Sequence, residues 1–376
     1  MSGEASVTLF LAGDVMTGRG VDQILPHPGD PRLHEPYVSS ALEYVRMAEI
    51  RHGEIPAPVP FAYPWGDALA ELERRAPHAR IINLESAVTD RGDPADKAVL
   101  YRMSPTNLPV LSAAGIDVCT LANNHLLDWG REGLLDSLDH LDRAGIRQAG
   151  GGRNVGQARA PAVLPLPGGR RLLVFSRGSP TAGVPGDWAA VPDESGIAFL
   201  SRLSDREADR LVQEIAVVRR PGDVVVVSLH WGPNWGYEVR RAERRFAHRL
   251  VESGHVHVIH GHSSHHPRPM EVHRERAILY GCGDFLNDYE GISGHREFRP
   301  DLVLMYLVTV EADGDGGESS LELTLVPFRL RKLRLQRADP EEAGWLAETL
   351  NREGRSLGTR LELGDAESGP VLRWVG

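Results

Sequence analysis

Cysteine, lysine and long apolar runs are all scarce in this chain of 376 residues. The two cysteines, Cys119 and Cys282, lie among apolar residues, so a disulfide framework is excluded and we expect reduced, buried thiols. No stretch of about 18 or more apolar residues is present, which argues against a transmembrane helix. The first 12 residues also lack the basic start and apolar core of a signal peptide. We therefore expect no membrane partner and a cytoplasmic location.

Positive charge is also in deficit. The chain has 42 basic and 52 acidic residues, which gives a net charge of -10. Such a balance does not favour nucleic acid as a partner. Lys97 and Lys332 are the only lysines, so arginine carries nearly all the positive charge, as is common in proteins from GC-rich genomes. The composition is that of a globular protein with ample apolar residues for a core, and it leaves the oligomeric state open.

Five short apolar runs each end on a residue that can bind a metal ion. The residues at or just after these ends are Asp14, Glu85, Asn124, His125, His230, His262 and His265. The carboxyl ends of neighbouring strands converge in α/β folds, where they form ligand sites. Carboxylate, amide and imidazole groups together suit a divalent ion. The sequence therefore predicts a metal centre at the ends of the strands.

The densest part of this pattern lies at residues 258–267, where four histidines occur within seven positions. A polar surface loop with histidines that stabilise it by hydrogen bonds is the alternative interpretation. More ligands are present than one tetrahedral ion needs, and two ions about 3.5–4 Å apart bridged by one carboxylate would use them all. We expect two divalent ions per chain, among which Mn, Fe, Zn, Ca and Mg are not distinguished by the sequence.

The order of apolar runs and helical patterns predicts an α/β fold. No repeat or long linker divides the chain, so we expect one domain over residues 1–376. Residues 302–310 and 321–330 are predicted to form an antiparallel pair joined by a loop at 313–320. The segments expected to lie outside the regular core are three inserted loops and a C-terminal extension, at residues 27–64, 177–196, 284–300 and 340–376.

Five motifs together resemble the CapA family, the poly-γ-glutamate capsule-type proteins of the calcineurin-like metallophosphoesterase superfamily. The motifs are Gly-Asp-Val-Met at 13–16, Asn-Leu-Glu at 83–85, Ala-Asn-Asn-His at 122–125, His-Trp-Gly at 230–232 and Gly-His-Ser-Ser-His-His-Pro at 261–267. The resemblance covers roughly residues 7–330. It implies a four-layer αββα sandwich, the calcineurin-like metallophosphoesterase fold, with a dinuclear metal site at the strand ends.

The resemblance also implies a role for each motif residue. Asp14 and His265 would bind the first ion, and Glu85 would bridge the two ions. The second ion would be bound by Asn124, His230 and His262, while His125 would act beside the metals as an acid or base. The chain departs from the superfamily pattern at three places: Met16 replaces a histidine, Glu85 replaces the bridging aspartate, and an extra residue leaves His265 and His266 as alternatives for one role.

Two uses of such a centre follow from general chemistry. Metal ions can activate water for hydrolysis, or they can stabilise an enolate while a base on each face moves a proton. His125 and His295 are candidates for that pair of bases. The altered first motif and His295 make the chain similar to the CapA-like enzymes found with lasso-type ribosomal peptides, which epimerise the α-carbon of the C-terminal residue of a precursor peptide.

We therefore expect a metal-dependent peptide epimerase with a peptide or amino-acid-derived substrate. Arg19, Arg102 or Arg296 would hold a terminal carboxylate, and Trp188, Trp231 and Trp235 are candidates to receive an aromatic side chain. Two alternatives remain open at this point. One is a metal-dependent hydrolase of phosphoesters or amides, and the other is an accessory protein of polyglutamate or capsule assembly.

Overall fold

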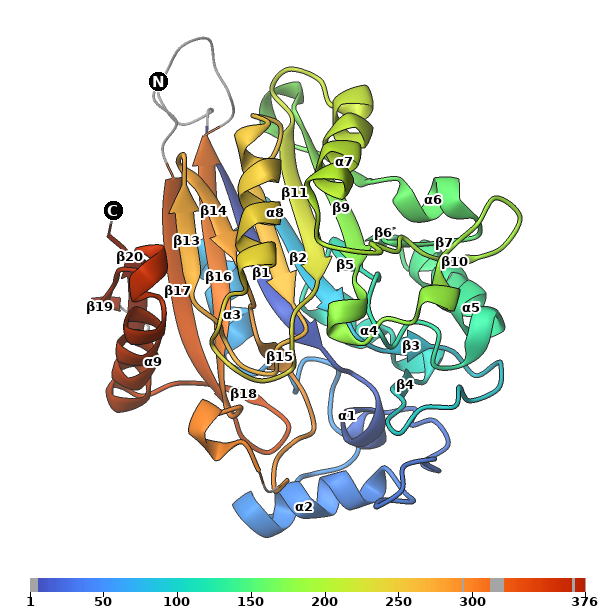
Figure 1. The fold of residues 1–376 in the computed structure, drawn as a ribbon. Helices are drawn as coiled ribbons and strands as arrows, with labels where there is room; N and C mark the ends of the chain where they lie inside the picture. Colours follow the sequence, from blue (N-terminus) through green and yellow to red (C-terminus); the bar gives the residue numbers. More distant parts are fainter. Residues whose placement is uncertain (1–5, 293, 312–320, 367–368, 376) are drawn as a thin grey trace.

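The computed structural model describes residues 6–292, 294–311, 321–366 and 369–375. Figure 1 shows two large β-sheets with helices around them. The fold is therefore a mixed α/β fold, as predicted. The loop expected at 313–320 lies outside the described residues. Among the helices described, none is long and apolar enough to span a membrane.

The larger sheet has a parallel half and an antiparallel half. Within the described residues its strands run in the order β19-β20-β17-β16-β1-β2-β5-β6, with β15 beside β1 and β18 beside β17. The predicted antiparallel pair is confirmed as β16 and β17. The bounds are β1 Ser6–Val15, β2 Ala79–Leu84, β5 Val118–Thr120, β6 Arg147–Ala149, β15 Asp284–Leu286, β16 Leu302–Glu311, β17 Leu321–Leu330, β18 Leu335–Arg337, β19 Leu361–Ala366 and β20 Gly369–Trp374.

The second sheet is built around parallel strands β9, β11 and β12. Its order is β13-β14-β12-β11-β9-β8. The bounds of these strands are β8 Ala162–Pro165, β9 Arg171–Gly178, β11 Val224–His230, β12 Val258–His262, β13 Met270–His273 and β14 Arg276–Leu279. The remaining strands form two short pairs, β3 Ala87–Val88 with β4 Arg102–Met103 and β7 Gly151–Gly152 with β10 Gly196–Ile197.

The two sheets face each other across a shared apolar core. Val7, Leu9 and Leu11 of β1 belong to the same buried cluster as Val224 and Val226 of β11. Because side chains alternate along a strand, the other face of each sheet packs on helices. The helices described are α1 Arg19–Ile24, α2 Leu42–His52, α3 Ala68–Arg75, α4 Pro109–Ala113, α5 Gly130–Arg143, α6 Val155–Arg159, α7 Asp205–Val218, α8 Arg241–Glu252 and α9 Pro340–Glu353.

Among the helices described, five cover the outer faces of the two sheets. Helices α7 and α8 pack on the second sheet, and α3, α4 and α5 pack on the larger one. Helix α9 lies against β17, β19 and β20. The layers therefore follow the order helix, sheet, sheet, helix, and α1 and α2 lie below the strand ends in Figure 1.

All four segments predicted to lie outside the core contain regular elements. Residues 177–196 include the end of β9 and two 3₁₀ helices, Pro180–Ala182 and Gly186–Trp188. Residues 27–64 include α2, residues 284–300 begin with β15, and residues 340–376 contribute α9 and the strand pair β19–β20. The last pair extends the larger sheet through contacts with β17, so this extension is integrated into the fold. The division into one domain with inserted loops stays a prediction.

Candidate metal centre

The polar residues at the strand ends meet at one edge of the two sheets. Strands β1, β2 and β5 are parallel neighbours, and β11 and β12 pair so that His230 lies opposite His262. Parallel neighbours end on the same side of a sheet. The larger sheet therefore supplies carboxylate and amide groups, and the second sheet supplies imidazoles, to one site.

A first group of possible ligands consists of Asp14, His230 and His262. One donor atom from each lies within 4.8 Å of the others. The Nδ1 atoms of His230 and His262 are 2.8 Å apart, and Nε2 of His230 lies 2.9 Å from Oδ1 of Asn124. Burial is the largest factor that lowers the pKa of both histidines well below the usual value, so both rings are neutral and offer a lone pair.

A second group consists of Asp14, His265 and Asp284, again with donor atoms within 4.8 Å of one another. Nδ1 of His265 lies 3.0 Å from Oδ1 of Asp284, and Asn287 donates a hydrogen bond of 2.8 Å to the other oxygen of Asp284. His266 points elsewhere, because its Nε2 accepts a hydrogen bond from the backbone of Gly236. Of the two alternatives, His265 is the residue beside Asp14.

Asp284 was missed as a candidate ligand at the level of sequence. It follows the apolar run at 277–280 after three further residues, which is the same pattern that identified Asp14. The structure pairs β15 with β1 so that Asp284 lies opposite Asp14. Asp14 is thus the residue common to both groups, a position that the resemblance implied for Glu85.

Glu85 lies beside Asp14 in the same buried site. The side chain of Asn83 donates hydrogen bonds to Asp14 (2.7 Å) and to Glu85 (3.3 Å). Burial raises the pKa of Asp14 to about 7; Glu85 opposes this increase and Asp284 adds to it. Burial and then Asp14 raise the pKa of Glu85 well above its usual value. Burial and mutual repulsion therefore destabilise the charged forms of Asp14 and Glu85.

His125 is held by a carboxylate that the sequence did not single out. Its Nδ1 lies 2.6 Å from Oδ2 of Asp128, and its Nε2 lies 3.7 Å from Oε1 of Glu85. Lys97 donates a hydrogen bond of 2.6 Å to the other oxygen of Asp128. Burial, opposed by Asp128, lowers the pKa of His125 to about 4. Lys97 was detectable as one of only two lysines in the chain, but Asp128 carried no comparable signal.

Among the possible ligands, Asn124 and His265 line a pocket of about 430 Å³. His125 and His295, the two predicted bases, both line it. The ring of His295 stacks on Trp235 with 4.1 Å between ring centroids and 8° between planes. The pocket is also lined by Arg19, Lys97, Tyr101 and Tyr289.

The predicted substrate contacts are dispersed. Arg19 reaches the pocket, but its guanidinium is buried and ion-paired with Glu35 and Asp288. Arg102 lies over the ring of Trp129 and lines a separate small cavity. The existing ion pairs of Arg19 and the separate position of Arg102 do not favour a carboxylate contact beside the donor groups, and that role stays a prediction for both arginines.

The side chains of Trp231 and Arg296 do not line the pocket of about 430 Å³. Trp231 is buried, and its indole N–H donates to the carbonyl of Tyr280. It belongs to the core beneath α8, which does not favour the predicted substrate contact. Arg296 lines a cavity next to the pocket. Trp188 stands near Lys97, whose Nζ is 5.1 Å from the ring centroid.

Fold and site together define a mixed α/β protein with a buried carboxylate and imidazole centre at the ends of its parallel strands. The chain belongs to the bacterial capsule synthesis protein family PGA_cap, whose model matches residues 8–289. The resemblance found in the motifs is thereby confirmed at the level of the family.

Relatives within this family carry names linked to polymer synthesis. A probable polyglutamine synthesis accessory protein of Mycobacterium tuberculosis is 47% identical over 358 residues, which cover 94% of this chain and 93% of the relative. The capsule biosynthesis protein CapA of Bacillus anthracis is 24% identical over 286 residues, covering 75% of this chain and 60% of that protein. The PGA biosynthesis protein CapA of Bacillus subtilis is 24% identical over 213 residues, with 55% and 52% covered.

Proposed function

We propose that this protein is an accessory protein in the synthesis of a glutamine or glutamate polymer and binds the polymer at a divalent-metal centre. The name of the Mycobacterium tuberculosis relative supports a role in polyglutamine synthesis. The names of the two CapA relatives support a role in capsule or PGA biosynthesis. The observation that carries the proposal is structural. Asp14 belongs to two adjacent groups of possible ligands, and one pocket is lined by His265 of the second group and by Asn124, which contacts His230 of the first.

The residues present fit two divalent ions. Asp14, Glu85 and Asp284 are 0–2% exposed, and burying three carboxylates together is costly unless cations compensate them. Lys97 is already engaged by Asp128. One ion would be held by Asp14, His230, His262 and Asn124, and the other by Asp14, His265 and Asp284, with Glu85 beside both.

Such ions would supply Lewis acidity toward a carbonyl or amide oxygen of the polymer. Mixed imidazole and oxygen ligands favour a first-row transition metal over Mg or Ca. The layer order of the fold supports the further proposal that the chain adopts the calcineurin-like αββα sandwich. A fold does not fix a reaction, so the activity has to be argued from the pocket.

The chain's own side chains would position the polymer and handle protons. The carboxylate of Asp128 accepts a hydrogen bond from Nδ1–H of His125. The other ring nitrogen, Nε2, then faces Glu85 with a free lone pair and can accept a proton. Lys97 holds Asp128 in place. Trp235 and Tyr101 give the pocket aromatic walls, which exclude water from the groups they cover.

The decisive experiment measures polymer binding with and without metal. We expect metal-loaded protein to bind glutamine or glutamate oligomers at least about tenfold more tightly than chelated protein, and His230→Ala to remove that difference. Equal affinity of the metal-loaded protein, the chelated protein and His230→Ala for the oligomer would overturn the proposal. The length of the recovered oligomer, measured by mass spectrometry, shows whether amide bonds are also hydrolysed.

A second candidate function is epimerisation of the C-terminal residue of a peptide. One observation favours it: His125 and His295, on different segments, line the same pocket, as a mechanism with two bases requires. The relatives reported above are named for polymer and capsule synthesis, which gives this candidate no support. In heavy water, deuterium uptake at one α-carbon without cleavage of the peptide would establish epimerisation, provided that His295→Asn abolishes this uptake for one of the two stereoisomers. An absence of exchange would exclude it.

A further inference from the structure

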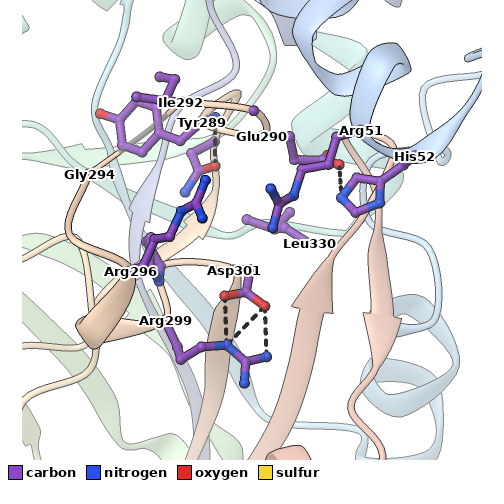
Figure 2. Close-up of a pocket in the computed structure, with 13 residues that line it drawn as sticks. Arg51, His52, Tyr289, Glu290, Ile292, Gly294, Arg296, Arg299, Asp301 and Leu330 are labelled. Carbon is purple, nitrogen blue, oxygen red and sulfur yellow. Dashed lines mark hydrogen bonds and ion pairs between the residues drawn. The ribbon is translucent and has the colours of Figure 1, made fainter.

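A second cavity, of about 270 Å³, lies next to the pocket of the metal centre. It is bounded by the end of α2, by the segment after β15 and by the end of β17. Figure 2 shows the side chains that line it. Tyr289, Ile292, Gly294 and Pro300 line both this cavity and the pocket, so one stretch of chain forms the wall between them.

The two acidic residues of this cavity are already engaged. Glu290 accepts hydrogen bonds from the backbone N–H groups of Lys332 and Leu333, and Nε2 of His52 lies 3.2 Å from it. Asp301 is bound by Arg299, with N–O distances of 2.9 and 3.0 Å. Their negative charges are therefore directed into the wall of the cavity.

The guanidinium groups of Arg51 and Arg296 have no hydrogen-bonding or ion-pair partner within the part of the chain that the structure describes. In Figure 2 their guanidinium groups are directed toward the middle of the cavity from different segments. Positive charge also dominates the surroundings: after burial, the arginines at 331, 51 and 329 lower the pKa of His52. Two guanidinium groups that converge in this way provide a fork of donors suited to a carboxylate or phosphate.

The wall between the cavity and the pocket connects directly to the metal centre. Asn287 lines the cavity and donates to Asp284, while its own oxygen accepts from the backbone of Tyr289. The ring of Tyr289 packs edge-on against His265, with 5.3 Å between centroids. A chain that passes from the pocket over this wall would place its next units beside Arg51 and Arg296.

We propose that the cavity is a carboxylate subsite in which Arg51 and Arg296 hold a side group of an acidic polymer whose neighbouring units lie at the metal centre. The identity of the polymer rests on the function proposed above, whereas the preference for a carboxylate rests on the cavity itself. The subsite makes the protein selective for a glutamate polymer over a neutral glutamine polymer.

The test compares a fluorescent glutamate oligomer with the same oligomer in which every carboxylate is converted to an amide. Binding is measured by fluorescence anisotropy on the full chain, both metal-loaded and chelated. We expect the wild type to prefer the charged oligomer by about tenfold or more, and Arg51→Gln with Arg296→Gln to lower that ratio toward one. Arg46→Gln is the matched control, because Arg46 is exposed on the same helix α2 but does not line the cavity.

The charge preference and the metal effect are separate readouts. A ratio that falls in the double variant while metal has no effect would support the subsite and refute the proposed function. A metal effect with equal affinity for both oligomers would refute the subsite alone, as would a double variant that behaves like Arg46→Gln. Inorganic phosphate that displaces the charged oligomer at lower concentration than acetate would assign the cavity to phosphate and overturn the carboxylate proposal.

Discussion

At the scale of single residues, Asp14 is the carboxylate that both groups of possible ligands share, and it is fully buried. It faces His262, with 3.7 Å between Oδ1 and Nδ1, and its Oδ2 accepts a hydrogen bond from the backbone of Ser263. A fully buried carboxylate is stabilised only by close hydrogen-bond donors or cations. Replacement of one of the imidazoles that face Asp14 should therefore lower the amount of metal bound by the protein.

We predict that His230→Ala lowers the affinity for the ion of the first group by more than about tenfold, since even partners of metal ligands contribute 10–100-fold. The ion content of dialysed protein, measured by elemental analysis, checks this. His34→Ala, at an exposed histidine, is the control and should retain full content. Equal ion content in the two variants would show that His230 is not a ligand.

At the scale of elements, Arg19 joins segments that are far apart in the sequence. From the start of α1 it contacts Asp288 after β15, and Glu35 and Tyr44 in the segment 27–64. Its guanidinium also lies 3.9 Å from the ring centroid of Tyr44. This arginine therefore fastens the segment with α2 to the wall between the pocket and the cavity.

Arg19→Met should destabilise the protein by about 3–5 kcal/mol, because it leaves Glu35 and Asp288 buried without a positive partner. Urea unfolding measures the loss, and limited proteolysis should show faster cleavage within residues 27–64. Arg32→Met, at an exposed arginine, should change the free energy of unfolding by less than about 0.5 kcal/mol. A similar small effect for Arg19→Met would mean that its ion pairs do not hold these segments.

Arg171, the first residue of β9, is linked to Asp223, which directly precedes β11, and its Nε atom lies 3.1 Å from Oδ1 of Asp223. Burial alone would raise the pKa of Asp223, but the hydrogen bonds from Arg171 and the backbone of Arg220 outweigh it and lower the pKa below 3.8. A lowered folded-state pKa stabilises the protein above the unfolded value and loses this effect as the pH falls through the folded value.

We therefore predict that Asp223→Asn destabilises the protein by about 1–3 kcal/mol at neutral pH. The difference from the wild type should shrink as the pH falls below about 4. Urea unfolding at a series of pH values measures both effects. A difference that is constant across that range would contradict the lowered pKa.

At the scale of the whole molecule, the site lies between the two sheets. Asp14 comes from β1 of the larger sheet, and His230 and His262 come from β11 and β12 of the second. An ion bound by these groups would link the sheets in addition to the apolar core between them. Ligand binding to the folded state alone stabilises it by mass action.

Removal of metal should therefore lower the melting temperature. Free metal at 100 times its dissociation constant contributes about 2.7 kcal/mol, and a chelator should abolish this contribution. Calorimetry with and without chelator measures the change in melting temperature. In His230→Ala this change should be smaller than in the wild type. An unchanged melting temperature in the wild type would argue against an ion that binds only the folded state.

Much of the centre was predictable because strand periodicity is a local property of the sequence. Asp14, His230 and His262 follow apolar runs, and parallel strands bring such ends together. Asp284 follows the same rule less clearly, because three residues separate it from its run. Asp128 lies beyond the strand end, and its contact with Lys97 depends on how two loops fold over each other.

The sequence by itself determined the α/β class, the family and the residues at the ends of the parallel strands, since these depend on short-range patterns of apolar and polar residues. Only the tertiary structure decided which carboxylate is common to both donor groups, that Trp231 belongs to the core, and that Arg19 is paired with two carboxylates while Arg51 and Arg296 face a cavity. These outcomes depend on contacts between residues far apart in the chain, and no local pattern specifies which buried charge finds a partner.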